Sequence, residues 1–268
     1  MARFLKDRSA SHGQITGTPI LIGEQKMEEA EIHLMDISEE ELVEKKLESI
    51  EEAAQCIDSE PVSWINIWGI HDVAMIQRLG ELFQIPALLL EDILNTDHRP
   101  KYEEMESLGI FILKMARYDQ ENQRISATQC AVILGERFVI TLQEQKANDF
   151  NLIRERIRKT KKRIRFLDPD YLAYVLLDAI VDNYVQVVES LGRKIEALED
   201  RLFNKSDPEL IEDIHVLKNE LSYLRKSVRP VREFMLQVMK SENELFQEKY
   251  LPFIRDLNEL VFQATDAI

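Results

Sequence analysis

Four segments in the first half of the chain have the residue types and lengths of β-strands. They are rich in β-branched and aromatic side chains, and the turn sequences DQENQ and GER separate the last three of them. Strands that follow one another through short turns pair with opposite directions. We therefore predict an antiparallel meander, with strands over residues 62–68, 109–119, 124–134 and 137–143.

Two other segments in this half carry apolar residues at helical spacing. The first covers residues 38–57, where Ser38 followed by Glu41 matches a capping box. The second covers residues 72–85, where Asp72 is suited to be the N-cap of a helix that starts at Val73. Because helices and strands are mixed, residues 1–148 are predicted to form an α/β domain.

From Asp149 onward the strand signals stop and only the helical period remains. Asp-Pro pairs at 168–169 and 207–208 each supply an N-cap followed by proline at the first helical position, and Ser241 to Glu244 is another capping box. The first of the resulting helices is on the order of 50 Å long. The helices are predicted over residues 170–204, over 208–240 with a kink at Pro230, and from 242 onward.

The predicted fold class is therefore α+β or α/β. A mostly antiparallel sheet flanked by helices (residues 1–148) precedes a region of long helices that form a funnel or stalk (residues 149–268). The last helix has no glycine, proline or basic residue that would end it at "VFQATDAI". We therefore expect that helix to continue in a longer natural chain.

Composition narrows the classes of partner. With 34 basic and 49 acidic residues the chain has a formal charge of −15, which repels nucleic acid and attracts cations. Cys56 and Cys130 form neither a disulfide framework nor a thiolate zinc motif, so a reducing cytosol is expected. No signal peptide and no run of eighteen apolar residues is present, so this chain is not expected to span a membrane or to be secreted.

One basic segment runs against this acidic balance. Residues 154–165, RERIRKTKKRIR, hold eight basic residues and one acid without an interleaved aromatic platform. In a chain of charge −15, we interpret the segment as the basic face of a helix that pairs with acidic helices nearby. Nucleic acid is not a predicted partner.

Two groups of acids are candidates for cation binding. Glu91, Asp92, Asp97 and His98 lie within eight residues and resemble the edge of an oxygen-rich cation site, although solvated acids at a helix end would give the same spacing. Two further acids, Asp178 and Asp182, stand at i and i+4 on one helix face, where they repel unless a cation or basic residue lies between them. Spacing alone leaves both interpretations open for each group.

Catalytic machinery has no signal in the sequence. The His71-Asp72 pair lacks further ligands at hydrolase spacing, and the chain has no GxSxG motif and no phosphate-binding glycine loop among its eight glycines. The chain is therefore not predicted to be an enzyme.

A set of short strings resembles a known family in order and approximate spacing. The similarity, from about residue 61 to the C-terminus, is to the cytoplasmic domain of the CorA-type magnesium and cobalt transporters. The strings are "WINIWGIHD", "LLLEDILNTDHRPK", "FILKMARYD", "RERIR", "DYLAYVLLDAIVDNY" and "YLPFIRDLNEL". Where that family commonly has Ile-His-Pro, this chain has Ile85-Pro86-Ala87, so an imidazole role there does not carry over, and Pro86 suits the first position of the next helix.

The resemblance implies a homopentameric funnel at the cytoplasmic face of the inner or plasma membrane. In that family the last helix continues as the pore-lining membrane helix. The two membrane helices and the Gly-Met-Asn loop are absent from this sequence. The implied function is magnesium sensing that gates a channel for Mg²⁺ and Co²⁺, in which bound divalent cations stabilise the closed state. Alternatives are the cytoplasmic domain of a related zinc transporter and a helical scaffold protein without a transport role.

The resemblance also implies a set of metal ligands. Asp92 matches the family's aspartate that faces the adjacent subunit, and Asp256 matches its partner there, with a divalent cation between them. Glu91 and Asp178 match residues of a second, nearby cation site, and Asp182 is included with them. Regulatory Mg²⁺ is the expected ion, and Co²⁺, Ca²⁺ or another divalent cation can take its place.

Overall fold

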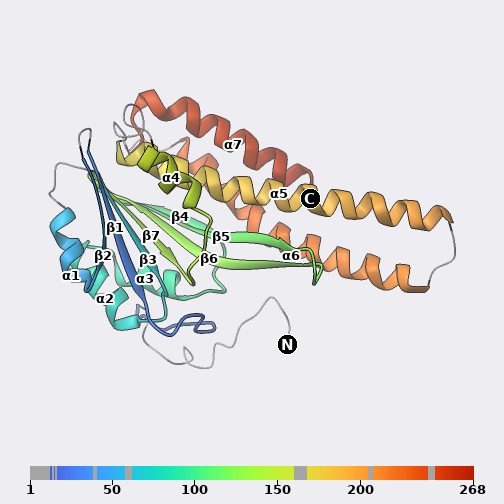
Figure 1. Ribbon diagram of the computed structural model, residues 1–268, viewed down its shortest axis with the longest axis horizontal. Helices are drawn as coiled ribbons and strands as arrows, with labels where there is room; N and C mark the ends of the chain where they lie inside the picture. The colour runs from blue at the N-terminus through green and yellow to red at the C-terminus, as the bar shows by residue number, and fades with distance from the viewer. Residues whose placement is uncertain are drawn as a thin grey trace.

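The structure is a computed structural model that describes residues 13, 15, 17–38, 41–57, 62–159, 168–204, 208–240 and 245–268. Its centre is a seven-stranded sheet with helices on both faces, and a pair of long helices projects beyond one side of the sheet (Figure 1). This arrangement confirms the predicted α+β fold with a helix-flanked sheet.

The sheet has the strand order β2-β1-β3-β7-β6-β5-β4. Neighbouring strands are antiparallel except β3 and β7, which run parallel. The strands are β1 (Glu31–Ile37), β2 (Leu42–Leu47), β3 (Val62–Trp68), β4 (Lys101–Glu104), β5 (Gly109–Asp119), β6 (Arg124–Leu134) and β7 (Phe138–Gln143). The four predicted strands are confirmed, with β7 starting one residue later than expected, and so is the antiparallel meander for β5, β6 and β7. Its extension to β3 is wrong, because β3 pairs parallel with β7.

The helix predicted over residues 38–57 is wrong in its first half. At the predicted capping box, the N–H of Ser38 donates to the carbonyl oxygen of Glu41 and the N–H of Glu41 donates to Ser38 Oγ, both at 3.0 Å. Strand β2 follows, and helix only begins at α1 (Ile50–Ala53), which continues into the 3-10 turn η2 (Ala54–Cys56). Strand β2 pairs with β1, a strand that was not predicted either.

The remaining helices follow their local signals more closely. Asp72 caps α2, since its Oδ1 accepts the N–H of Met75 at 3.0 Å, as predicted. The final helix begins nine residues later than predicted, and its predicted capping box at 241–244 lies outside the described residues. The helices are α2 (Val73–Leu82), α3 (Ala87–Leu94), α4 (Asn151–Lys159), α5 (Pro169–Asn204), α6 (Pro208–Val238), η3 (Glu248–Tyr250) and α7 (Leu251–Asp266).

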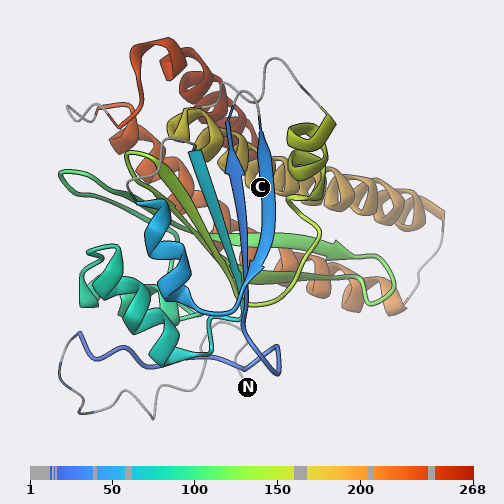
Figure 2. The ribbon, with the colours of Figure 1, turned by 60° about the vertical axis from the view of Figure 1, so that its left-hand side comes forward.

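Each face of the sheet has its own apolar core, because side chains alternate along a strand. Trp64 of β3 and Phe111 of β5 pack with α5, α6 and α7 on one face. Ile65 of β3 and Ile110 of β5 pack with α1, α2 and α3 on the other. The two helical layers are seen on either side of the strands in Figures 1 and 2. Helices α3 and α7 therefore lie on opposite faces of the sheet.

Helix α5 is the central element of its layer. In the part of the chain that the structure describes, it is the one helix that is long and apolar enough to cross a membrane by length and composition alone. Its apolar character has a packing reason, because Leu172, Leu176, Ile180 and Tyr184 are fully buried on the side that faces the sheet. These four apolar residues of α5 therefore belong to the domain core.

The basic segment 154–165 is described only as far as residue 159. Arg158 pairs with Glu44 through Nη2 and Oε2 at 2.7 Å, so its acidic partner lies on a strand and not on a helix as expected. Arg154 is 8% exposed, and its guanidinium carbon lies 4.8 Å from the ring centroid of Trp64 and 5.2 Å from that of Trp68. Burial lowers the pKa of Arg154 to about 10. Part of the basic face is therefore a core element.

Candidate metal centre

Helix α3 carries the first pair of predicted ligands, Glu91 and Asp92. The helix begins after Pro86, which is its N-cap residue and thus stands one position earlier than predicted. Both carboxylates are partly buried, since they stand beside the buried face of the helix. That face is formed by Leu89, Leu90, Ile93 and Leu94.

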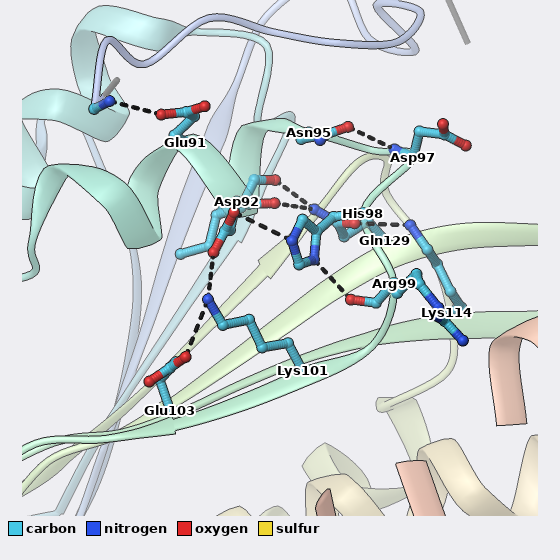
Figure 3. Close-up of polar contacts among 12 residues, drawn as sticks. Glu91, Asp92, Asn95, Asp97, His98, Arg99, Lys101, Glu103, Lys114 and Gln129 are labelled. Carbon is cyan, nitrogen blue, oxygen red and sulfur yellow. Dashed lines mark hydrogen bonds and ion pairs between the residues drawn. The ribbon is translucent and has the colours of Figure 1, made fainter. Parts of the chain in front are cut away.

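Two side chains of its own chain hold Asp92, the imidazole of His98 and the ammonium of Lys101 (Figure 3). Its Oδ1 lies 3.2 Å from His98 Nε2, and its Oδ2 lies 2.8 Å from Lys101 Nζ. Lys101 Nζ also lies 3.1 Å from Glu103 Oε1. Gln129 of β6 fixes the end of the helix by donating from Nε2 to the carbonyl oxygens of Asp92, at 3.1 Å, and Ile93, at 2.6 Å.

Glu91 points to a different partner. Its Oε2 accepts the backbone N–H of Gly17 at 2.7 Å, which ties the N-terminal segment to α3 (Figure 3). The N–H of Asp97 donates to Asn95 Oδ1 at 3.1 Å, in an Asx turn that leads to His98. The four clustered residues of the sequence prediction thus serve different contacts, and Asp92 and His98 are the two that meet.

The second group of acids lies on the other side of the sheet, between α5 and α7. Burial, together with the charges of Asp182 and Asp256, raises the pKa of Asp178 to about 6. Burial and the same three carboxylates also raise the pKa of Tyr174 to about 12. Asp182 and Asp256 themselves are exposed. The prediction that Asp178 and Asp182 share a face is confirmed, and the fold adds Asp256 to them.

One chain does not bring all five predicted ligands together. Asp92 lies on the α3 side of the sheet and Asp256 on the α7 side. Within the described ranges, no three His, Cys, Asp or Glu side chains converge closely enough to hold a metal ion. The donor chemistry still suits Mg²⁺, which prefers carboxylate oxygen and keeps several of its waters. Burial is the main cause of the raised pKa of Asp178, and the charges of Asp182 and Asp256 add to it, so a cation beside these three carboxylates would favour the ionised form.

Two residues of this region were not predicted from the sequence. Lys101 follows Asp92 by 9 residues and Gln129 by 37, and both reach it because strands β4 and β6 pass beside α3 (Figure 3). Lys101 had no signal of its own, since a lysine at the start of a short strand is common. Only the fold could reveal it as a partner of Asp92.

The comparison with protein families identifies the family of the chain. Residues 60–268 match the family described as "CorA-like Mg2+ transporter protein". The chain belongs to this CorA-like family. Members of the CorA-like family are transporters, which confirms that the chain is not an enzyme.

Individual relatives agree with this assignment. The chain is 36% identical over 263 residues to "Cobalt/magnesium transport protein CorA" of Thermotoga maritima, covering 98% of this chain and 75% of that protein. The soluble domain of CorA from Methanocaldococcus jannaschii has the same fold, with a TM-score of 0.67 at 22% identity over 88% of this chain and 90% of that chain. The ZntB cytoplasmic domain from Vibrio parahaemolyticus, with a TM-score of 0.66 at 12% identity over 88% and 90%, shares the fold alone.

Proposed function

We propose that this chain is the magnesium-sensing, gating part of a CorA-type transporter for Mg²⁺ and Co²⁺, on the cytoplasmic side of the membrane. In this proposal five copies assemble in a ring, and a divalent cation binds between Asp92 of one subunit and Asp256 of the next. Residues 1–148 would carry the sensing surface and residues 149–268 would transmit its state along the long helices.

The observation that carries the proposal is the separation of the two carboxylates within one chain. Asp92 and Asp256 lie on opposite faces of the sheet, so no single subunit can close a cation between them. In a cyclic assembly, however, one face of each subunit meets the opposite face of its neighbour. Two half-sites on opposite faces are therefore what a ring of cation-bridged subunits requires.

A second cation is proposed near the first. Asp178 and Asp182 add their charges to Asp256 on the α7 side, while Glu91 lies next to Asp92 on the α3 side. When the two sides meet, all five carboxylates gather at one interface. A single divalent cation would leave most of that charge uncompensated, so a second cation there is favourable.

Weak individual sites are sufficient for gating. At a free concentration ten times Kd, each bound cation contributes RT ln 11, or about 1.4 kcal/mol, and five sites contribute about 7 kcal/mol. Inverting a 1:99 equilibrium between two conformations takes about 5.5 kcal/mol. A ring of five weak magnesium sites can therefore hold a closed state when magnesium is abundant and release it when magnesium falls.

The proposal is tested by the association of the 268-residue chain. We expect its mass in sedimentation velocity to increase with Mg²⁺ and to fall again with EDTA, because the cation relieves repulsion across the interface. Asp92→Asn and Asp256→Asn should each weaken this response about tenfold, since Asn keeps an oxygen but removes the charge.

A matched control is available on the same helix as Asp256. Asp266 pairs with Arg232 within its own chain, at 3.3 Å between Oδ1 and Nη1, so Asp266→Asn should keep the wild-type response to magnesium. A mass distribution of the wild-type chain that does not change between Mg²⁺ and EDTA would refute interfacial sensing. An equal loss in all three variants would show that the effect is one of net charge.

A further inference from the structure

In the free chain, the carboxylate of Asp92 already has two partners. Lys101 and His98 occupy one oxygen each, at 2.8 and 3.2 Å. The side chain of Asp92 is 20% exposed and that of Lys101 is 31% exposed, so this pair is better shielded from water than an ordinary surface ion pair. A divalent cation that binds Asp92 must therefore compete with a cation that the protein itself supplies.

Lys101 remains charged in this setting. Two carboxylates favour its ammonium form, since Lys101 Nζ lies 2.8 Å from Asp92 Oδ2 and 3.1 Å from Glu103 Oε1. An ammonium and a divalent cation on one carboxylate repel each other at short range. Binding of Mg²⁺ at Asp92 therefore favours departure of Lys101 from Asp92 Oδ2.

The fold provides a second partner for the ammonium. Glu103 stands two residues after Lys101 on β4, so both side chains lie on the same side of the strand. Its Oε1 is already 3.1 Å from Lys101 Nζ, and Figure 3 shows the ammonium lying between the two carboxylates. A small rotation about the lysine side chain is sufficient to leave Asp92 and to keep an ion pair with Glu103.

We propose that Lys101 is a tethered competitor of the regulatory cation, which neutralises Asp92 when the site is empty and moves to Glu103 when a divalent cation binds. This inference rests on the proposed function, because it assigns a role to Lys101 at the same site. Lys101 sets the magnesium concentration at which the site fills. It also limits the repulsion between subunits in the empty state, so that loss of magnesium loosens the ring without driving its subunits apart.

The size of the effect follows from competition. When Lys101 occupies Asp92, only the fraction of sites that it leaves free can bind magnesium. The apparent Kd for magnesium is then the intrinsic Kd divided by that fraction. Partly shielded, charge-assisted pairs are favoured over their open forms by roughly three- to tenfold. Removing the ammonium should therefore lower the magnesium concentration for half-maximal response by about three- to tenfold.

The test compares the 268-residue chain with Lys101→Met, which keeps the aliphatic length and removes the charge, and with Lys101→Gln as a second neutral variant. The measurements are the Mg²⁺ concentrations for half-maximal association, by sedimentation, and for half-maximal thermal stabilisation. Both variants should respond at about three- to tenfold lower magnesium. Lys159→Met makes the same change in net charge at a lysine that pairs with Glu155, and should respond as the wild-type chain does.

Glu103 provides the sharper comparison. Glu103→Gln removes the alternative partner, so Lys101 stays on Asp92 and the response should shift to about two- to threefold higher magnesium. In the double variant Lys101→Met/Glu103→Gln this shift should vanish, because Glu103 acts through Lys101. Glu103 could instead act only through the attraction between its own charge and the bound cation. In that case the double variant would respond at higher magnesium than Lys101→Met, and that result would overturn the proposed movement of Lys101 to Glu103.

The proposed function and the role of Lys101 can be refuted separately. If the wild-type chain does not respond to magnesium, the proposed function fails. If the wild-type response is present and depends on Asp92, but Lys101→Met and Lys101→Gln respond at wild-type or higher magnesium, only the role of Lys101 is refuted.

Discussion

Replacement of Asp178 by asparagine should stabilise the chain at neutral pH in the absence of divalent cations. Burial, followed by the charges of Asp182 and Asp256, raises the pKa of Asp178 from its ordinary value of 3.8 to about 6. The folded state therefore binds a proton more tightly at this group than the unfolded state does. Asparagine has nearly the same shape as aspartate but cannot ionise, so Asp178→Asn removes the unfavourable charge.

The magnitude follows from the pKa. A tenfold change in proton affinity corresponds to about 1.4 kcal/mol, so a pKa near 6 in place of 3.8 gives an upper limit of about 3 kcal/mol. Asp178 is only partly buried, and water screens its neighbours, so we expect a gain of about 1 to 2 kcal/mol. Such a gain raises Tm by several degrees in a chain of this size.

The sign of the pH dependence is fixed by the same linkage. Because the folded state binds more protons between pH 4 and 6, the wild-type chain loses stability as the pH rises through this range. Above pH 6 the full penalty is present, and below pH 4 it is absent. The advantage of Asp178→Asn over the wild-type chain should therefore be largest at pH 7.5 and small at pH 4.

Urea denaturation at both pH values, in EDTA, measures the difference in the free energy of unfolding. Asp182→Asn is the matched comparison, since Asp182 is exposed on the same helix face and its replacement removes only one of the charges near Asp178. Its gain at pH 7.5 should be smaller. A gain for Asp178→Asn that is equal at pH 7.5 and pH 4, or a loss at pH 7.5, would refute the reasoning.

Three further substitutions concern stability. Gly80→Ala in α2 should destabilise by about 1 to 2 kcal/mol in urea denaturation, because its Cβ would overlap Leu90 Cδ1 and lie 3.3 Å from the carbonyl oxygen of Ile85. Gly192→Ala in α5, where nothing lies within 4 Å of the added methyl group, should stabilise by up to about 1 kcal/mol, and a similar loss at both glycines would contradict the packing argument. Arg154→Met should change the free energy of unfolding by less than about 1 kcal/mol, since the cost of burying the guanidinium offsets its contacts with two indoles, and a loss above about 3 kcal/mol would contradict this.

The sequence predicted those elements whose signals are local. Strands β5, β6 and β7 are joined by short turns, and α5 starts at the proline that follows its Asp168 signal. Strand β2 was missed because it is an edge strand in which only Leu47 is buried, so the alternation of apolar and polar residues that marks a half-buried strand is absent. Pairing with β1 is what makes this segment a strand, and that contact is tertiary.

The contacts of the candidate site also fall into local ones, which the sequence predicts, and tertiary ones, which it does not. Asp178 and Asp182 share a helix face because they stand at i and i+4, and this spacing can be seen in the sequence alone. The approach of Asp256 depends on how α7 packs against α5, and the pairing of Asp92 with Lys101 depends on where β4 passes α3. These contacts join residues whose sequence separation carries no periodic signal. The assignment of Asp92 and Asp256 to one interface stays a prediction, because it concerns two subunits.

The parallel pairing of β3 with β7 has a consequence for how the chain folds during synthesis. Trp64 of β3 pairs with Val139 of β7, across 75 intervening peptide bonds, while β5, β6 and β7 pair through short turns. At about 5 to 20 residues per second, a ribosome needs roughly 4 to 15 s to make β7 after β3. During that interval β3 lacks its partner β7 along one edge. The meander β5-β6-β7 must therefore form before the seven-stranded sheet can be completed. The parallel pairing of β3 with β7 should be the step that limits the folding rate.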